Sequence, residues 1–352
     1  MRYLPMQRNK IFIAHSNSGQ QLLDWHARRE NCARNLGYKI ETMAMMDYHP
    51  YTIFPYLDKK WKKRDTVLMR FYEKLGEKIA DSDIFIHYNG ALIHPKFLQQ
   101  FTQLKIYHCA DDPEASDVIS RPVVHAYDIH AISNPTCLDL YRSWGCKHVF
   151  FWPLGAFHYD FAVENRSQTA VRDISLSFVG TKYGVTRWRY VHRIPILKYW
   201  SGLYTKKAFF DRLEQAFPSM VAYGGGWRMG RIEDSDIPDL YRRTLVGINV
   251  HNNMGVHNGR LFDLAAYGVC QICDNKQHLH HVFVPGKEII GYESTNEAID
   301  LIRYYLAHPN EANAIGIAGR ERYYRDYTMD AIWNKFFEDL GRLSITADLS
   351  GV

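Results

Sequence analysis

The stretch HNGRLFDLAAYGVCQICDN (residues 257–275) places a polar turn and an apolar helix directly before an apolar run of strand type. Asn258 and Gly259 are typical of a helix start, and residues 261–266 supply the apolar face of a buried helix. Gly268 is suited to the C-cap that ends such a helix. The stretch therefore predicts a helix that packs closely against a buried strand.

The start of this helix also allows an interpretation other than packing. Helix N-termini present unpaired N–H groups and a partial positive charge, which suit a phosphate or pyrophosphate. His257, Asn258, Gly259 and Arg260 would together form such a cradle, and Asp263, one turn later, would hold sugar hydroxyls. The stretch alone leaves packing and ligand binding open, so the rest of the chain has to decide between them.

Length and composition set the first bounds. The chain has 352 residues, of which 46% are hydrophobic, so two domains are expected. It contains no run of about 18 uninterrupted apolar residues, and residues 1–16 lack the apolar run and cleavage site of a secretory signal. The sequence thus predicts a soluble, cytoplasmic protein without a membrane span.

The charge is mildly basic, with a formal net charge of +5. This balance favours an anionic ligand but is too weak for a dedicated nucleic-acid binder. The densest basic run, DKKWKKR (residues 58–64), is interpreted as a solvated helix face, with contact to an anionic surface or nucleic acid as the alternative.

The cysteines argue against a metal or redox pair. Six are scattered along the chain, and only Cys270 and Cys273 have a C-x-x-C spacing. They lie in a predicted strand, where positions three apart face opposite sides of the sheet. Free, reduced thiols are therefore expected.

Strand-like and helix-like segments alternate along the whole chain. One series runs from KIFIAHS (residues 10–16) to HVFFWPLG (148–155), and a second begins at ISLSFVGT (174–181) after a polar joining segment. Such alternation favours a parallel, doubly wound sheet in each half. A ligand then belongs at the carboxyl ends of the strands, in the cleft between the halves.

Sequence motifs exclude some of the common uses of this architecture. No G-x-G-x-x-G follows the first strand and no P-loop motif occurs, which argues against a dinucleotide oxidoreductase or a P-loop enzyme. The two D-x-D triplets, residues 81–83 and 234–236, are interpreted as a helix end and a surface turn and not as metal sites.

An ordered series of motifs extends through the second half of the chain. It comprises SLSFVGTKYGVTRWR (175–189), YGGGW (223–227), residues 247–275, and a final block, residues 280–329, that contains AHP and AGRERY. HCADDPEAS (108–116) adds to it in the first half. This series resembles glycosyltransferases of the two-Rossmann GT-B type, and within them the CgeB-like group of spore-maturation glycosyltransferases.

The resemblance implies an α/β, GT-B fold: two Rossmann-like domains whose parallel sheets face a central cleft. The expected boundaries are residues 1–165 for an N-terminal acceptor domain and 166–328 for a C-terminal nucleotide-sugar donor domain. Residues 329–352 would form a C-terminal helix that crosses back to the N-terminal domain.

The resemblance also implies a nucleoside diphosphate sugar as co-substrate, a UDP-sugar in the first instance, without a bound metal or further cofactor. Cations at the diphosphate stabilise the leaving group without a metal. Asp263 falls where these enzymes hold the ribose hydroxyls, and residues 223–227 would wall the base. The expected donor-binding residues are Thr181, Lys182, Arg187, Gly225, Trp227, His257, Asn258, Gly259, Arg260 and Asp263.

The expected catalytic residues come from the first half. The acceptor hydroxyl must lose a proton, which a carboxylate or imidazole near the cleft usually takes. Asp111, Asp112 and His15 are the candidates, although an Asp-Asp-Pro element is also a good turn and helix cap. A hexosyl- or pentosyltransferase acting on a glycan, a small molecule or DNA is therefore expected.

Two departures from the pattern keep alternatives open. Retaining relatives carry a glutamate where this chain has Gly255, and the ribose acid is shortened to Asp263. The alternatives are a DNA-modifying glycosyltransferase acting on a hydroxylated base, a nucleotide-sugar epimerase or hydrolase, and a non-catalytic nucleotide-sugar or coat-type binding protein.

Overall fold

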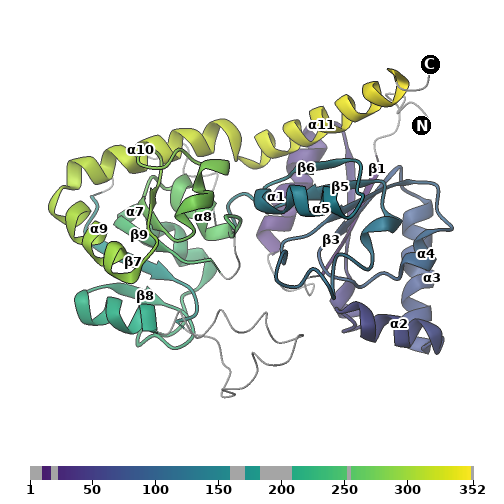
Figure 1. Cartoon of the computed structure of the whole chain (residues 1–352), viewed down its shortest axis with the longest axis horizontal. Helices are drawn as coiled ribbons and strands as arrows, with labels where there is room; N and C mark the ends of the chain where they lie inside the picture. The colour runs from purple at the N-terminus through teal and green to yellow at the C-terminus, as the bar shows by residue number, and fades with distance from the viewer. Residues whose placement is uncertain (1–9, 17–22, 159–170, 183–207, 252–254, 350–352) are drawn as a thin grey trace. The chain divides into compact units, whose positions relative to one another are not determined.

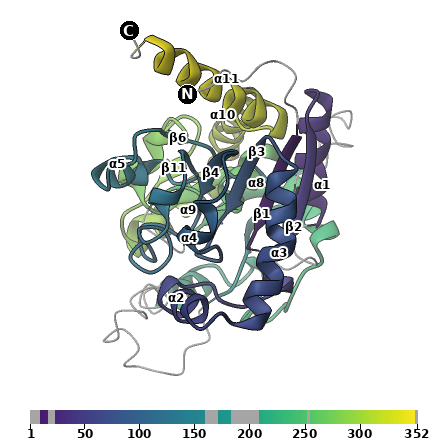
Figure 2. The ribbon, with the colours of Figure 1, turned by 90° about the vertical axis from the view of Figure 1, so that its right-hand side faces the viewer.

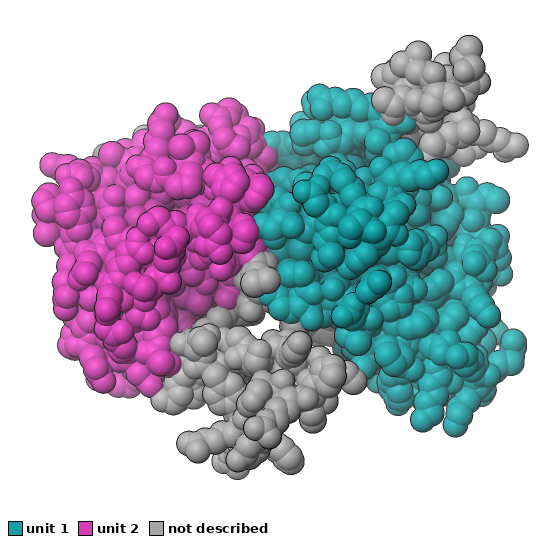
Figure 3. All heavy atoms as spheres, viewed as in Figure 1, with its two compact units in different colours: residues 1–153, 329–352 teal, residues 154–328 magenta. Residues whose placement is uncertain are grey.

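The computed structural model describes residues 10–16, 23–158, 171–182, 208–251 and 255–349. The chain divides into two compact units (Figure 3). Unit 1 comprises Met1–Pro153 together with Met329–Val352, and unit 2 comprises Leu154–Thr328. Each unit is built around one parallel sheet, as the alternating pattern predicts. The predicted α/β class with two Rossmann-like sheets is confirmed.

The sheet of unit 1 has six strands in the order β2-β1-β3-β4-β5-β6 (Figure 2). All its strand pairs are parallel, and Ile11 of β1 is in register with Ile40 of β2 and Ile84 of β3. Its elements are β1 (Lys10–His15), α1 (Leu23–Asn35), β2 (Lys39–Ala44), η1 (Met45–Asp47), α2 (Phe54–Lys62), α3 (Thr66–Ala80), β3 (Ile84–Tyr88), α4 (Pro95–Leu98), β4 (Leu104–His108), η2 (Val124–Ala126), β5 (Ile129–Ile132), η3 (Pro135–Cys137), α5 (Leu138–Ser143), β6 (Val149–Phe151) and α11 (Met329–Leu349).

Apolar periodicity explains these elements. All five residues of β3, IFIHY, are buried, as expected for a central parallel strand covered on both faces. In α3, the side chain of Asp65 caps the helix by accepting from the backbone N–H of Leu68 at 3.2 Å. The buried residues of that helix recur at helical spacing and are Leu68, Phe71, Tyr72, Leu75 and Ile79.

The C-terminal helix α11, yellow in Figure 1, packs on the sheet of unit 1 beside α1. Aromatic contacts hold it: the ring of Phe336 stacks on Trp152 at 4.4 Å, and Phe337 stacks on Tyr38 at 3.9 Å. Trp333 is completely buried. Burying side chains of this size supplies the hydrophobic free energy that fixes the helix.

The sheet of unit 2 has five strands in the order β11-β10-β9-β7-β8, again all parallel. The helix predicted from the opening stretch is α8, and the strand after it is β10. The elements are β7 (Ile174–Val179), β8 (Val221–Tyr223), η7 (Asp234–Asp236), α7 (Ile237–Arg243), β9 (Thr244–Asn249), α8 (Gly259–Ala266), β10 (Cys270–Cys273), η8 (Lys276–His281), β11 (Ile290–Gly291), α9 (Thr295–Ala307) and α10 (Pro309–Asp326).

Unit 2 begins at Leu154, earlier in the chain than the boundary at residue 165 expected from the sequence. The reason is packing against α8. The ring of Phe157 lies so close to Gly259 that a Cβ there would collide with it, and His158 is hydrogen-bonded to Asp263. Residues 154–158 therefore belong structurally to unit 2.

The basic run 58–64 lies at the end of α2, and two of its five cations form ion pairs. Lys60 forms an ion pair with Asp65 at 2.8 Å, and Lys62 forms one with Asp58 at 2.6 Å. The ring of Trp61 stacks on His94 at 4.6 Å and packs against the core. These contacts favour the solvated helix face over a nucleic-acid contact.

All six cysteines are free thiols and are buried. In the described part of the chain, no helix combines the length and the apolar character that crossing a bilayer requires.

Candidate functional site

The start of α8 is held in place by a network of side-chain amides. The Oδ1 atom of Asn258, the N-cap residue, accepts from the backbone N–H of Leu261 at 2.8 Å. The amides of Asn258 and Asn249 donate to each other at 2.8 and 3.1 Å, and Asn249 also donates to Gln271 at 2.8 Å. The helix start is thereby joined to the ends of β9 and β10.

Arg260 lies at the carboxyl ends of β7 and β9. Its Nε donates to the carbonyl of Val179 at 2.7 Å, and its Nη1 donates to the carbonyl of Val250 at 3.2 Å. The guanidinium also lies 4.5 Å from the ring centre of Phe178. Arg260 thus ties two neighbouring strand ends together, and this contact set identifies it as a positioning residue.

Asp263 is buried and directed at a residue that the sequence did not single out, His158. Its two carboxylate oxygens lie 2.8 Å from the backbone N and 3.0 Å from the Nδ1 of His158. The hydroxyl of Tyr267 donates to the carbonyl of His158 at 2.7 Å, and the Nε2 of His158 lies 3.6 Å from Asp234. Asp263 therefore fixes the imidazole of His158, whose Nε2 faces the carboxylate of Asp234.

Two glycine turns meet after β7 and β8. A side chain at Gly224, where φ is +125°, would collide with the carbonyl of Gly180. The backbone N of Lys182 donates to the carbonyl of Gly225 at 2.8 Å, which joins the turns. Trp227 donates from Nε1 to the carbonyl of Gly180 at 2.8 Å and buries its ring, so it serves packing more than it walls a base.

Lys182 is buried, and its ammonium lies between two carboxylates. It forms ion pairs with Asp211, at 3.1 Å, and with Glu214. Burial by itself would lower the pKa of Lys182, but the hydrogen bonds to Glu214 and Asp211 outweigh it and the pKa is raised. Lys182 is therefore a charged, paired group. Thr181 beside it is exposed, and Arg187 lies outside the described residues.

In unit 1 the Asp-Asp-Pro element follows β4, and its two carboxylates have different environments. Asp112 is completely buried and accepts from the hydroxyl of Tyr141 at 2.6 Å. Burial raises the pKa of Asp112 to about 6. Asp111 is partly exposed and accepts from the side-chain amide of Asn89 at 2.7 Å. Of the two carboxylates, Asp111 is the one accessible to solvent.

His15 ends β1 and is buried, with 4% of its surface exposed. Its ring stacks on His26 of α1 at 4.1 Å. Because β1 and β3 are neighbours in the sheet, His15 lies in register with Tyr88 at the same carboxyl edge. This edge also carries a buried arginine, Arg29, whose guanidinium lies against the ring of Tyr88.

Among the described residues, one group of side chains has the donor atoms and spacing of a metal site. The Nδ1 of His251 lies 2.7 Å from Asp274 and 3.9 Å from the Sγ of Cys273. Burial raises the pKa of the Cys273 thiol well above its usual value, so the sulfur is held in its protonated, weakly ligating form. His251 and Asp274 satisfy each other as a hydrogen-bonded pair.

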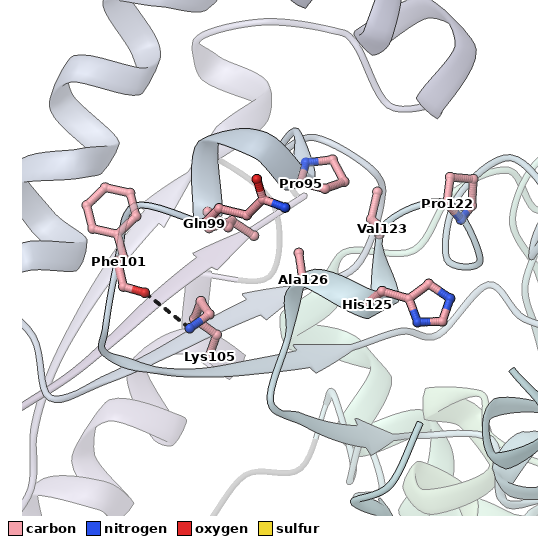
Figure 4. A pocket seen from close by; sticks show the side chains of 9 residues that line it. Pro95, Gln99, Phe101, Lys105, Pro122, Val123, His125 and Ala126 are labelled. Atoms are coloured by element: carbon pink, nitrogen blue, oxygen red, sulfur yellow. Dashed lines mark hydrogen bonds between the residues drawn. The ribbon is translucent and has the colours of Figure 1, made fainter. Parts of the chain in front are cut away.

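Figure 4 shows a surface pocket of unit 1 that does not include the strand-end residues described above. It is bordered by α4, the start of β4 and η2, and so lies away from the carboxyl edge of the sheet. Its cation, Lys105, donates to the carbonyls of Phe101 and Gln103 at 3.3 and 3.1 Å and pairs with Asp128 at 3.1 Å. These contacts satisfy the charge internally.

Part of this chain matches a known protein family. Residues 205–338 match the model of the glycosyl transferase-like family. The resemblance to CgeB-like glycosyltransferases is confirmed to this extent, and a search of curated protein sequences gives no match.

Solved structures of low sequence identity show the same GT-B fold. Sucrose-phosphate synthase from Thermosynechococcus elongatus matches with a TM-score of 0.63 and 14% identity, over 97% of this chain and 100% of that chain. Anabaena HepE in complex with UDP and glucose matches with a TM-score of 0.59 and 10% identity, over 95% and 100%. An alpha-glucosyltransferase in complex with UDP and a 13-mer DNA matches with a TM-score of 0.60 and 12% identity, over 94% and 98%.

Proposed function

We propose that this glycosyltransferase-family protein transfers a hexosyl group from a UDP-sugar to a hydroxyl acceptor, without a metal ion. The observation that carries the proposal is the arrangement at the carboxyl edge of the unit 2 sheet. There the N-terminus of α8 and Arg260 lie beside the turns after β7 and β8. Similar folds have been solved with UDP bound, which supports uridine as the base.

The residues take the following roles in this proposal. The backbone N–H groups at the start of α8 and the ammonium of Lys182 face the diphosphate, and Arg260 keeps the two strand ends in register. Asp263 acts through His158, whose Nε2 meets the nucleotide. In the reaction, the bond between the sugar C1 and the diphosphate oxygen breaks and a bond to the acceptor oxygen forms. Asp111 is the candidate for the acceptor proton.

The test is a thermal-shift screen of the full chain against UDP, GDP, ADP, CMP and dTDP, with and without Mg²⁺. A selective shift of a few degrees with UDP, unchanged by EDTA, is expected. Arg260→Ala should weaken UDP binding more than about tenfold, or about 1.4 kcal/mol, because the strand ends lose their shared tie. No response to any diphosphate would favour a non-catalytic binding protein.

Two measurements on the full chain distinguish the alternative functions. A DNA-modifying enzyme would bind DNA with a strong salt dependence. A hydrolase would consume the UDP-sugar in the absence of any acceptor. The paired charges of α2 give no support to the first of these.

A further inference from the structure

Unit 1 buries a cation among aromatic rings at the carboxyl edge of its sheet. Arg29, on α1, is only 3% exposed. Its Cζ lies 4.5 Å from the ring centre of Trp25, 4.7 Å from that of Tyr88 and 5.8 Å from that of Trp152. With His26, these residues form the group that we name the Arg29 cluster.

Several buried hydrogen-bond donors of this cluster have no acceptor among the described residues. Nη1 and Nη2 of Arg29, the hydroxyl of Tyr88 and the Nε1 of Trp152 are buried and have no partner among the described residues. The ring nitrogens of His26, one a donor and one an acceptor in the neutral imidazole, are also buried without a partner among the described residues. Buried polar groups are almost always satisfied in folded proteins, so several orphan donors in one place require an explanation.

The missing partner is an acceptor, and the charge identifies it as an anion. A guanidinium removed from water without a counter-ion is costly, and contacts with aromatic faces offset only part of that cost. His26 adds no second positive charge, since burial and the neighbouring Arg29 lower its pKa to about 3 and keep the ring neutral. An oxyanion would supply acceptors for the guanidinium fork, the phenol and the indole at once.

We propose that the Arg29 cluster binds an anionic oxygen group, a phosphate or a carboxylate. The group belongs to the acceptor, a conclusion that rests on the proposed function and on ligands of parallel α/β sheets binding at the carboxyl ends of strands. The acceptor is then a small molecule or glycan that carries a negative charge. A fork-shaped guanidinium suits either oxyacid, because both offer two oxygens in one plane.

The experiment titrates the full chain with inorganic phosphate and, separately, with acetate, at constant ionic strength set with NaCl. Melting temperature and titration calorimetry give the affinity for each anion. The variant is Arg29→Met, and the matched control is Arg34→Met on the same helix, where Arg34 is half exposed and paired with Glu30 at 2.8 Å. The wild type and Arg34→Met should bind one of the anions, and Arg29→Met should bind it at least tenfold more weakly.

The variant also carries a signature that a purely structural arginine would not show. Without added anion, Arg29→Met should melt at or above the temperature of the wild type, because an apolar side chain removes an uncompensated buried charge. A lower melting temperature together with an unchanged anion response would overturn the proposal, as would a wild type that responds to neither anion. Should Arg29→Met fail to fold, Arg29→Lys keeps the charge without the fork and should still lose at least tenfold in affinity.

The anion that binds more tightly distinguishes a phosphorylated acceptor from a carboxylate-bearing one. Failure of the proposed function is visible separately. An anion response that depends on Arg29, in a chain that does not bind UDP, would leave the site standing and remove its link to glycosyl transfer. UDP binding without any anion response would leave the proposed function standing and remove the anion site.

Discussion

The charged side chains at the carboxyl edges of the two sheets have contrasting surroundings. In unit 2, Lys182 lies between carboxylates, Asp263 holds His158, and Arg260 donates to carbonyls. In unit 1, Arg29 is 3% exposed, and its guanidinium lies against aromatic rings with no hydrogen-bond partner for Nη1 or Nη2 among the described residues. A paired charge is part of the scaffold, whereas an unpaired one is held at a cost that a ligand can remove.

The largest effect is expected for a second arginine, the half-buried Arg172 of unit 2. It donates to the carbonyls of Tyr241, Thr244, Tyr267 and Gly268 at 2.6–2.9 Å. Arg172→Met should therefore lower the free energy of unfolding by about 3–5 kcal/mol, since four carbonyls lose their donor. Calorimetric unfolding measures it.

The comparison variant is Arg243→Met, because Arg243 pairs with Asp173 at an exposed position. It should change the free energy of unfolding by less than about 1 kcal/mol. If Arg172→Met were as mild as this control, the distinction between paired and unpaired arginines would lose its basis.

The next effect concerns the buried carboxyl of Asp112. Its pKa is raised from 3.8 to about 6, so the folded state favours the protonated form. The resulting stability is fully present below about pH 4 and is lost as the pH rises through 6. Asp112→Asn imitates the protonated acid, so its stability relative to wild type should grow by about 3 kcal/mol between pH 4 and pH 7.

Urea unfolding of wild type and variant at matched pH isolates this contribution. His26 titrates in the same range with the opposite sign, because its pKa is lowered, but it is common to both proteins and cancels in the difference. Asp139→Asn, at a carboxylate 92% exposed, is the control for the loss of a carboxylate at the surface. A flat profile for Asp112→Asn would contradict its burial as an acid.

A smaller effect separates two roles of Asp263. If Asp263 acts through His158, then His158→Ala and Asp263→Asn should each weaken UDP binding about tenfold, and the double variant should be no worse than either, because the pair acts as one unit. Calorimetric titration with UDP measures all three. Unchanged affinity in His158→Ala with a loss in Asp263→Asn would instead place the carboxylate directly on the nucleotide.

The smallest effect is expected on α2. Lys62→Met removes an exposed ion pair with Asp58, which should cost less than about 0.5 kcal/mol of unfolding free energy. Fluorescence anisotropy with a labelled duplex should show no change in DNA affinity. A clear loss of DNA binding would reopen the nucleic-acid interpretation of the basic run.

The sequence by itself determined the elements and their type. Alternating apolar strands and amphipathic helices predicted two parallel sheets, and the residues 257–275 predicted α8 and β10, because periodicity and capping are local properties of the chain. It also placed Asp111 in the loop after a strand, Arg260 at the start of a helix and Asp263 one turn later, which is where they lie.

Only the tertiary structure decided which groups meet. His158 and Asp263 are 105 positions apart in the chain, and Arg260 reaches a carbonyl 81 positions away. No periodicity encodes such partners, because they depend on which strands become neighbours and on side-chain directions after packing. The same holds for Arg29, whose burial among rings from α1, β3 and the residue after β6 arises from the packing of the sheet.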